Sequence, residues 1–293
     1  MRVDKWIAEH NDGISRSYVA KLIDEGRVRV NGNVVKSSFK VGDDDEIEID
    51  FPEPEELEVT AENIPLDIVY EDSDVIVVNK PKGMVVHPAP GHYSGTLVNA
   101  LMYHCGDSLS GINGVLRPGI VHRIDKDTTG LIVACKNDKA HESLSEQFEK
   151  HSQVRKYRAI VLGVIKEDEG TIKASIARHP TDRKKMTVDN FKGREAITHF
   201  KVLERFKEFT YIECELETGR THQIRVHLKS INHPVLGDEV YGPSRCPIKN
   251  LQGQCLHAYL LGFVHPSTGE YIELRSNPEV PEYFTEILRK LPR

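Results

Sequence analysis

The sequence predicts an α+β protein, with a small N-terminal unit of two helices and a hairpin followed by a larger unit built on a mixed, largely antiparallel sheet. Three observations support this prediction. A length of 293 residues favours two domains over one. Near the N-terminus, helical periodicity is followed by strands that alternate with period two. From Leu66 onward, short strands and a few helices follow one another without regular βαβ alternation, which favours α+β over α/β.

The N-terminal unit is expected over residues 1–50. Apolar positions at helical spacing indicate two short helices, and Ser15 is a suitable N-cap for the second. The segment 27–30 alternates polar and apolar side chains, and Asn31-Gly32 is a pair that two-residue hairpin turns prefer. A further alternating strand is expected at 46–49. Together these elements form a helix-helix-hairpin unit.

A linker is expected between the two units, over residues 51–65. It opens with an acidic, proline-punctuated run, so the second unit spans 66–293. In that unit, runs of β-branched and aromatic residues indicate strands, and helical spacing of apolar residues indicates helices. The expected strands are 68–70, 75–81, 157–162 and 211–216, and the expected helices are 96–103, 139–149 and 281–291.

Charge is unevenly distributed along the chain. The formal net charge is −6, yet the segment 178–194 is strongly basic, whereas 43–50 and 53–62 are acidic. A basic run alone is more often a solvated loop, but segregation of this kind is typical of a nucleic-acid binder. The cations that we expect to contact phosphates are Arg16, Lys21, Arg27 and Arg29 in the first unit and Arg183, Lys184 and Lys185 in the second.

Composition argues against several other classes. The sequence has no apolar stretch long enough to span a membrane and no secretory leader, so we expect a cytoplasmic protein. The five cysteines are odd in number and never form C-x-x-C, which argues against a disulfide framework and a zinc site. There is no phosphate-cradling glycine loop either. We therefore expect neither a metal nor an organic cofactor.

A cluster of charge interrupts two apolar runs at 119–121 and 131–134, both expected to be strands. Three interpretations compete for Asp125–Gly130. The simplest is a turn, because Asp and Thr bond their own backbone and Gly accepts positive φ, but this leaves His122-Arg123 unexplained. A calcium loop fails because Lys136 occupies the twelfth position. The third is an active carboxylate at a strand end.

A second stretch favours that third interpretation. After the strand at 211–216, Thr221 is a possible N-cap for a helix whose buried stripe holds Ile224 and Leu228. Spacing alone favours an ordinary solvated face opposite that stripe. The alternative is a cationic face that meets the acidic loop. The residues of this face are His222, Arg225 and Lys229.

Together these stretches resemble the RluA/RluD family of RNA pseudouridine synthases, over about residues 66–273. The segment His122–Asp125, followed by Thr128-Thr129-Gly130, matches the family's catalytic motif with Ile124 in place of the commoner Leu. Gly219–His227 matches a later motif throughout. Residues 1–50 resemble the S4 RNA-binding domain, above all at Gly26–Gly32. The S4-like leader and the run His87–Gly91 are closer to the RluD branch.

The resemblance implies a redox-neutral reaction in which uracil is detached from ribose C1′, turned and rejoined through C5. It assigns the reaction to Asp125, either as a nucleophile or as a base, and makes Arg225 its cationic partner. Tyr157 is implied as the active-site tyrosine that stacks on uracil. The residues implied in substrate binding are Arg123, which fills the stack vacated by a flipped base, Ile224 under the base, Arg220 and His222.

The implied partner is structured RNA, expected to be ribosomal RNA or a pre-ribosomal particle, with the protein acting as a monomer. Two other functions stay open on the residues alone. Asp125 and Asp127 are two neighbouring carboxylates, as a glycoside hydrolase requires, although the cationic helix does not suit a neutral sugar. A non-catalytic RNA-binding protein would explain the basic segments but would leave Asp125 without a purpose.

Overall fold

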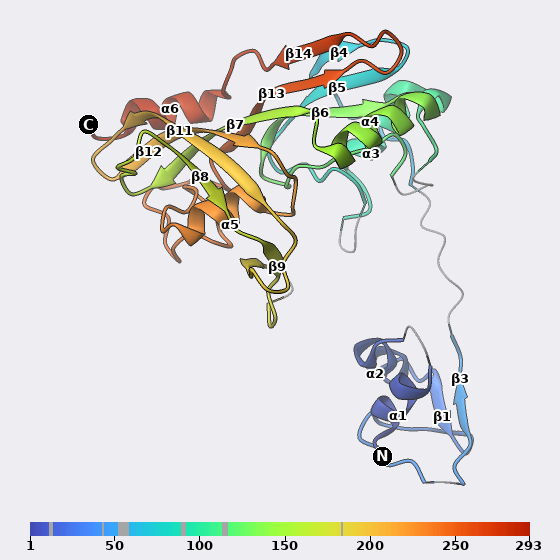
Figure 1. Cartoon of the computed structure of the whole chain (residues 1–293). Coiled ribbons are helices and arrows are strands. Elements are labelled where there is room, and N and C mark those ends of the chain that lie inside the picture. Colours follow the sequence, from blue (N-terminus) through green and yellow to red (C-terminus); the bar gives the residue numbers. More distant parts are fainter. Residues whose placement is uncertain (12–13, 43, 52–58, 89–91, 113–116, 183) are drawn as a thin grey trace. The chain divides into compact units, whose positions relative to one another are not determined.

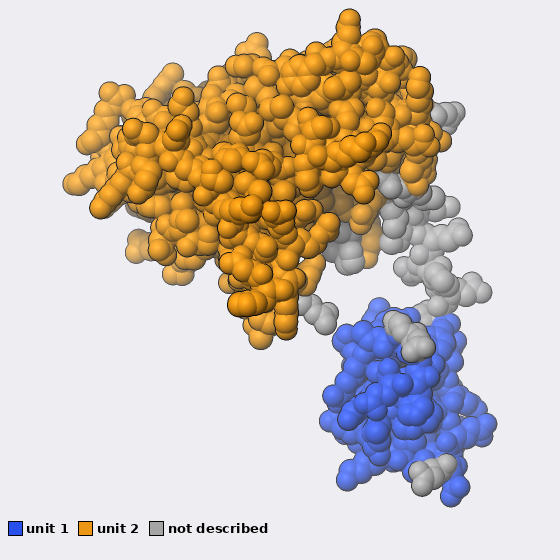
Figure 2. Space-filling view, in the orientation of Figure 1, with its two compact units in different colours: residues 1–57 blue, residues 58–293 orange. Residues whose placement is uncertain are grey.

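The computed structural model describes residues 1–293 except 12–13, 43, 52–58, 89–91, 113–116 and 183. The chain forms two compact units, Met1–Leu57 and Glu58–Arg293 (Figure 2). Residues 52–58 of the predicted linker lie outside the described residues, and 51 and 59–65 form no helix or strand, so the boundaries at 51 and 65 stay a prediction. Within the described part of the chain, no helix is long and apolar enough to cross a lipid bilayer.

The first unit packs two helices against a three-stranded sheet of order β2-β1-β3 (Figure 1). Its elements are α1 (Val3–His10), α2 (Arg16–Asp24), β1 (Val28–Val30), β2 (Asn33–Val34) and β3 (Ile47–Ile49). The Ser15 hydroxyl accepts from the Tyr18 amide at 3.2 Å, which confirms the predicted cap. Asn31 and Gly32 both have positive φ, as the hairpin turn between β1 and β2 requires. The unit has its own core, which includes Val3, Ile7 and Leu22.

The second unit is built on one large sheet of order β4-β5-β6-β13-β7-β12-β11-β8, with β14 paired to β13. Its strands are β4 (Ile68–Glu71), β5 (Val75–Lys80), β6 (Thr129–Cys135), β7 (Val154–Leu162), β8 (Glu169–Lys173), β11 (Ile197–Arg205), β12 (Phe209–Leu216), β13 (Leu256–Val264) and β14 (Tyr271–Arg275). A separate hairpin consists of β9 (Ile176–Arg178) and β10 (Met186–Val188).

The α-helices described beside this sheet (Figure 1) are α3 (Leu97–Cys105), α4 (Asp138–Lys150), α5 (Gln223–Ser230) and α6 (Glu282–Lys290), with a short 3₁₀ turn, η1 (Gly106–Ser108), after α3. Among the strand pairs of the described residues, β13 with β6 is parallel and the others are antiparallel. The predicted α+β class with a mixed, largely antiparallel sheet is therefore confirmed.

The two apolar runs around the charge cluster differ from each other. The run 131–134 lies in β6, which is buried along its whole length, as predicted. The run 119–121 is not a strand, because only Ile120 forms an isolated bridge, to Ala134. The Gly119 amide bonds Ser110 and its carbonyl bonds Cys135, so the chain crosses β6 without following it. The charge cluster is thus a loop that leads into the first residues of β6.

Strand β13 lies at the centre of the sheet and was not foreseen in the sequence. It pairs with β7 along one edge, and along the other edge first with β6 and then with β14. At the β6 contact the backbone of Gly130 has φ +111, and a Cβ atom built there would lie 2.2 Å from the Ala258 carbonyl oxygen. Gly130 therefore allows the catalytic-motif loop to enter the sheet against β13.

We predict that Gly130→Ala lowers the free energy of unfolding by about 3 kcal/mol or more, because backbone strain and overpacking each cost about 1–3 kcal/mol. Gly269→Ala is the matched control, since Gly269 also has positive φ but a Cβ there meets nothing within 4 Å. That control should cost only about 1–2 kcal/mol. Urea unfolding of both variants measures the difference, and equal losses would contradict the steric argument.

Candidate active site

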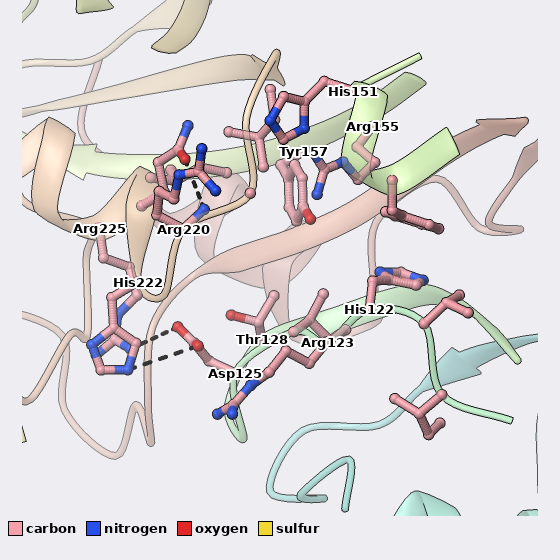
Figure 3. Close-up of a pocket in the computed structure, with 18 of the residues that line it drawn as sticks. His122, Arg123, Asp125, Thr128, His151, Arg155, Tyr157, Arg220, His222 and Arg225 are labelled. Carbon is pink, nitrogen blue, oxygen red and sulfur yellow. Dashed lines mark hydrogen bonds and ion pairs between the residues drawn. The ribbon is translucent and has the colours of Figure 1, made fainter. Parts of the chain in front are cut away.

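A cavity of about 620 Å³ opens in the second unit (Figure 3). Its walls come from the loop before β6, from β7, from the end of α4 and from the turn and first residues of α5. A smaller cavity of about 290 Å³ shares Asp125, Arg123, His222 and Arg225 with the first. Segments about a hundred residues apart in the sequence therefore meet around one carboxylate, that of Asp125.

The Asp125 loop is a turn whose backbone is fixed on several sides. The Thr128 amide donates to the Asp125 carbonyl at 3.1 Å, which closes the turn. The Lys126 carbonyl accepts from the Lys80 ammonium and from the Gly83 amide, both at 3.0 Å. The turn and the active carboxylate are thus compatible interpretations, because the turn presents an Asp125 side chain that is 18% exposed.

Lys80 is a buried cation that holds this loop. Its ammonium group donates to the carbonyls of Pro81, Met84 and Lys126 at 2.8–3.0 Å, and the residue is 1% exposed. Burial lowers the pKa of Lys80 to about 7, against the opposing effect of the nearby Asp127 and Asp125 carboxylates. Its hydrogen bonds connect the end of β5 to the Asp125 turn.

Arg225 lies between two carboxylates. Its Nη1 donates to Asp125 Oδ2 at 2.7 Å, while Nε and Nη2 donate to the two oxygens of Asp238 at 2.7 and 2.9 Å. Burial alone would lower the pKa of Arg225. The hydrogen bonds that Arg225 donates to Asp238 and the negative charge of Asp125 have the larger effect, so the pKa of Arg225 is raised. The guanidinium is therefore permanently charged and fixed in orientation by Asp238, which leaves one edge for Asp125.

Asp238 is itself held by backbone donors. Its Oδ1 accepts from the amides of Val240 and Tyr241 at 2.9 and 3.0 Å, and its side chain is fully buried. Burial raises the pKa of Asp238, but the hydrogen bonds from Arg225 and from these amides reverse the effect, so the pKa lies below its usual value. Asp238 is thus the ionised group that orients Arg225.

His222 lies next to the same carboxylate. Its Nε2 is 3.8 Å from Asp125 Oδ1, and its Nδ1 is 2.8 Å from the Tyr241 hydroxyl. Burial lowers the pKa of His222, and the charge of Asp125 opposes this. The Tyr241 hydroxyl also accepts from the Met186 amide of β10 at 2.8 Å. His222 is thereby held by a residue that also contacts the β9–β10 hairpin.

The predicted start of the helix after β12 is wrong by one residue. The N-cap is His222 instead of Thr221, with φ +56 and no side-chain cap. The preceding turn is closed by Gln223, whose Oε1 accepts from the Arg220 amide at 2.9 Å and from the Thr218 hydroxyl at 2.8 Å. Gln223, in the first turn of the helix, thus makes the side-chain contact that we expected Thr221 to make as the N-cap.

The cationic face predicted on this helix is only partly present. His222 and Arg225 both approach Asp125, but Lys229 is exposed and does not line the cavity. The helix is buried from Gln223 through Leu228, so it has no extended solvated face. His227 is fully buried, with Nδ1 2.9 Å from the Thr198 hydroxyl and Nε2 2.9 Å from the Ala174 carbonyl.

The wall beside Asp125 is largely apolar. Tyr157 on β7 and Ile224 on α5 are 6% and 4% exposed and line the larger cavity with Leu216 and Leu256. Burial raises the pKa of the Tyr157 phenol, so the group is neutral near pH 7. Arg123 is exposed at the mouth shared by both cavities. Arg220 lines the larger cavity and donates through Nε to the Glu195 carbonyl at 2.9 Å.

The other predicted RNA contacts do not belong to this cavity. Lys184 is exposed and Lys185 is half-buried, 3.7 Å from Asp182, whereas Arg183 lies outside the described residues. In the first unit, three of the four predicted cations are ion-paired and the fourth, Arg29, is exposed. The pairs are Arg16 with buried Asp4 at 2.8 Å, Lys21 with Glu25 at 3.5 Å, and Arg27 with Asp50 at 2.8 Å.

Comparison with known proteins identifies the family. Residues 74–230 match the model of the RNA pseudouridylate synthase family, and residues 1–47 match the S4 domain. The chain belongs to this family. It is an RNA pseudouridine synthase, an isomerase that converts uridine in RNA to pseudouridine, and it carries an S4 domain at its N-terminus. The family resemblance and the S4-like leader predicted from the sequence are confirmed, and the family decides against a glycoside hydrolase and a non-catalytic binder.

Relatives match over nearly the whole synthase. The RNA pseudouridine synthase YlyB of Bacillus subtilis is 55% identical over 99% of this chain and 94% of its own. The ribosomal large subunit pseudouridine synthase D of Zymomonas mobilis is 47% identical over 96% of this chain and 90% of its own. Among solved structures, human RNA pseudouridylate synthase domain containing 1 matches with a TM-score of 0.59 and 25% identity, over 82% of this chain and 99% of that one.

Several residues of the site were not assigned a function from the sequence. Only the fold shows that Asp238 contacts Arg225 and that Lys80 contacts the Asp125 turn. His122 Nε2 accepts from the Val133 amide at 3.0 Å, and burial, together with the charge of Arg155, lowers the pKa of His122 to about 3. Arg155, two residues before Tyr157, was given no function from the sequence.

Metal-type side chains gather at one other place among the described residues. Asp72, Asp74 and His265 bring ligand atoms within 4.8 Å of one another, but none of the three lines either cavity at Asp125. Asp72 already accepts from the Tyr70 hydroxyl, and its other neighbour at 2.7 Å is His265 Nε2. The residues around Asp125 offer a paired carboxylate and cations, which do not make a metal-binding set.

We predict that Asp238→Asn lowers the free energy of unfolding by roughly 3–5 kcal/mol at neutral pH, the usual loss on breaking a buried ion pair. The folded pKa of Asp238 is depressed, so its contribution is present above its unfolded value and is lost as the pH falls through the folded value. The variant should therefore lose less stability in acid than the wild type. Urea unfolding at neutral and acidic pH tests this, and parallel pH curves would refute it.

Proposed function

We propose that the synthase modifies uridines of large-subunit ribosomal RNA and that Asp125 is its catalytic residue. The observation that carries the site assignment is the 2.7 Å contact between Arg225 Nη1 and Asp125 Oδ2 in a cavity also lined by Tyr157 and Ile224. This contact places a fixed positive charge directly beside a carboxylate at the cavity wall. The target is supported by the relative from Zymomonas mobilis, which is a ribosomal large subunit pseudouridine synthase.

The chemistry requires an anion beside the ribose. When the bond between uracil and C1′ breaks, the sugar becomes electron-deficient, and the Asp125 carboxylate either bonds to it or removes a ribose proton. Both routes need Asp125 in its charged form. Arg225 donates to the Asp125 carboxylate, and Asp238 fixes the orientation of the guanidinium, so Arg225 holds Asp125 in place in the cavity.

Tyr157 and Ile224 hold the base while it turns. The Tyr157 ring gives an aromatic face for uracil, and Ile224 gives an apolar surface on the α5 side of the cavity. The Tyr157 hydroxyl assists removal of the C5 proton after the new bond forms. Because a uridine within folded RNA cannot reach Asp125 while stacked, it is flipped out, and exposed Arg123 fills the vacated place. Arg220 and His222 complete the contacts to the nucleotide.

The partners follow from this assignment. The synthase acts as a cytoplasmic monomer on ribosomal RNA or a pre-ribosomal particle. The isomerisation is redox-neutral and needs no nicotinamide, and the sequence has no Cys/His spacing of metal-site type, so we expect neither an organic cofactor nor a metal. The S4 domain and the basic hairpin, with Lys184 and Lys185, bind the RNA backbone. Mapping pseudouridines in ribosomal and transfer RNA, with and without the protein, tests the target.

We predict that Asp125→Asn lowers turnover by at least about 10²–10⁴-fold, the usual contribution of a positioned acid–base group, while fold and RNA binding persist. Asn keeps the shape of Asp but cannot carry the charge. Asp127→Asn, in the same turn, is the control and should keep readily measurable turnover. Tritium release from C5-labelled uridine in ribosomal RNA measures both, alongside thermal unfolding. Near wild-type turnover of a folded Asp125→Asn protein would overturn the assignment.

We predict that deletion of residues 1–57 leaves the second unit folded, since each unit has its own core. Affinity for ribosomal RNA should fall and the salt dependence of binding should flatten, by about 0.7–0.9 in log–log slope for each phosphate that the leader neutralises in the full-length protein. Filter binding across a salt series, with thermal unfolding as the control for folding, measures both. An unchanged affinity and slope would argue against RNA binding by the leader.

A further inference from the structure

One end of the larger cavity holds a cation that the reaction at Asp125 does not use. Arg155 lies two residues before Tyr157 on β7, and both are buried on the same face of the strand. Arg155 is 7% exposed, and its Nε and Nη2 are buried without a hydrogen-bond partner within the described part of the chain. Its guanidinium lies over the Phe148 ring, 5.6 Å from the ring centre. Arg155 is thus a buried charge that no carboxylate of the described residues pairs with.

Further cations lie around Arg155. Arg220 and Arg194 line the same end of the cavity, as does His151, whose buried Nδ1 also has no hydrogen-bond partner among the described residues. Burial lowers the pKa of Arg155, and the charge of Arg220 adds to the effect, although the phenol of Tyr157 opposes it. Figure 3 shows Arg155 and His151 near Tyr157, across the cavity from Asp125.

Among the described residues, the carboxylates near this end form no ion pair with Arg155. Glu149 lines the cavity but is exposed and forms no ion pair within 4.0 Å among the described residues. Glu195, whose carbonyl binds Arg220, directs its carboxylate to Lys173 at 3.6 Å. A guanidinium left buried without an anion is strongly unfavourable, so a site of this kind fits a ligand that brings the negative charge.

We propose that the Arg155 end of the cavity binds a phosphate group of the RNA strand that carries the target uridine, an inference that rests on the proposed function of Asp125. The base site and the cation cluster belong to one cavity of about 620 Å³, which leaves room beyond a single base. Phosphodiester oxygens are the acceptors that guanidinium groups recognise best in nucleic acids. Arg155 thus fixes the strand while the uracil is detached and turned.

Gly219 leaves space for the Arg155 guanidinium. A Cβ atom added at Gly219 would lie 2.6 Å from Arg155 Nη1 and 3.3 Å from Nη2. The glycine therefore leaves space for the guanidinium beside Arg220, where an anion can bridge the two groups. Gly219→Ala displaces the end of a flexible side chain instead of backbone, so it perturbs the site without removing the charge.

The experiment compares full-length Arg155→Gln and Arg155→Lys with Arg205→Gln, which removes an equal charge from an exposed arginine paired with Asp168 outside the cavity. Binding to a transcript of bacterial large-subunit ribosomal RNA is measured across a salt series. Arg155→Gln should weaken binding about tenfold or more, as expected when a charge-assisted hydrogen bond is removed. Its log–log salt slope should shrink by about 0.7–0.9, the value for one phosphate. Arg155→Lys and Arg205→Gln should keep the wild-type slope.

Other readouts exclude competing explanations. Gly219→Ala should weaken binding in the same direction, and Arg155→Gln should not lower the unfolding temperature, because Nε and Nη2 make no hydrogen bond within the described part of the folded chain. An unchanged salt slope with a loss of kcat and a shifted pH profile would instead make Arg155 a partner of Tyr157 and overturn the proposal. A lower unfolding temperature with unchanged binding would assign a structural function and also overturn it.

A last experiment distinguishes a phosphate group of the RNA from free inorganic phosphate as the ligand. Line broadening of inorganic phosphate in ³¹P spectra, abolished in Arg155→Gln while RNA binding and its salt slope stay unchanged, would indicate a free-phosphate site and overturn the RNA assignment. If the wild type forms no pseudouridine in the transcript, the proposed target fails. The salt-slope difference between Arg155→Gln and Arg205→Gln still tests the phosphate site on its own, so the two failures are distinguishable.

Discussion

The Arg225 guanidinium holds the site together because it connects two carboxylates of unlike environment. Asp238 is fully buried and bound by backbone amides, so it cannot move and cannot be protonated easily. Asp125 faces a cavity and accepts a single bond from the same cation. Asp238, the buried carboxylate, therefore orients the Arg225 guanidinium, and Asp125, the accessible carboxylate, is the one that can react. The arrangement requires α5, the segment after it and the loop before β6 to meet, which is what the order of strands in the sheet achieves.

The sequence predicted the elements whose signals are local. The cap at Ser15, the Asn31-Gly32 turn and the apolar run of β6 each depend on neighbours within a few residues, and each is confirmed. Strand β13 was missed, because a strand buried on both faces shows no alternation. The run 119–121 was misjudged for a related reason. Its apolar side chains fit a strand, but hydrogen bonds to Ser110 and Cys135 decide its path.

The residues of the site also fall into those that the sequence predicted and those that only the fold shows. Asp125 and Arg225 were reached through long motif matches and Tyr157 through the family resemblance, and the fold brings all three to one cavity. The error of one residue at the start of α5 arose because Thr221 has the usual capping side chain, whereas Gln223 supplies the actual contact from inside the helix. Arg155 carried no signal of its own, since an arginine two residues before a tyrosine is unremarkable until its burial without a partner is known.

The contact between Gly130 and the Ala258 carbonyl has a consequence for the gene. No side chain larger than hydrogen fits there, and the backbone conformation disfavours every other L-residue. In a glycine codon, any change of the first or second base alters the amino acid, whereas the third base is silent. At this position, then, neutral change in the gene is confined to the third base of the codon.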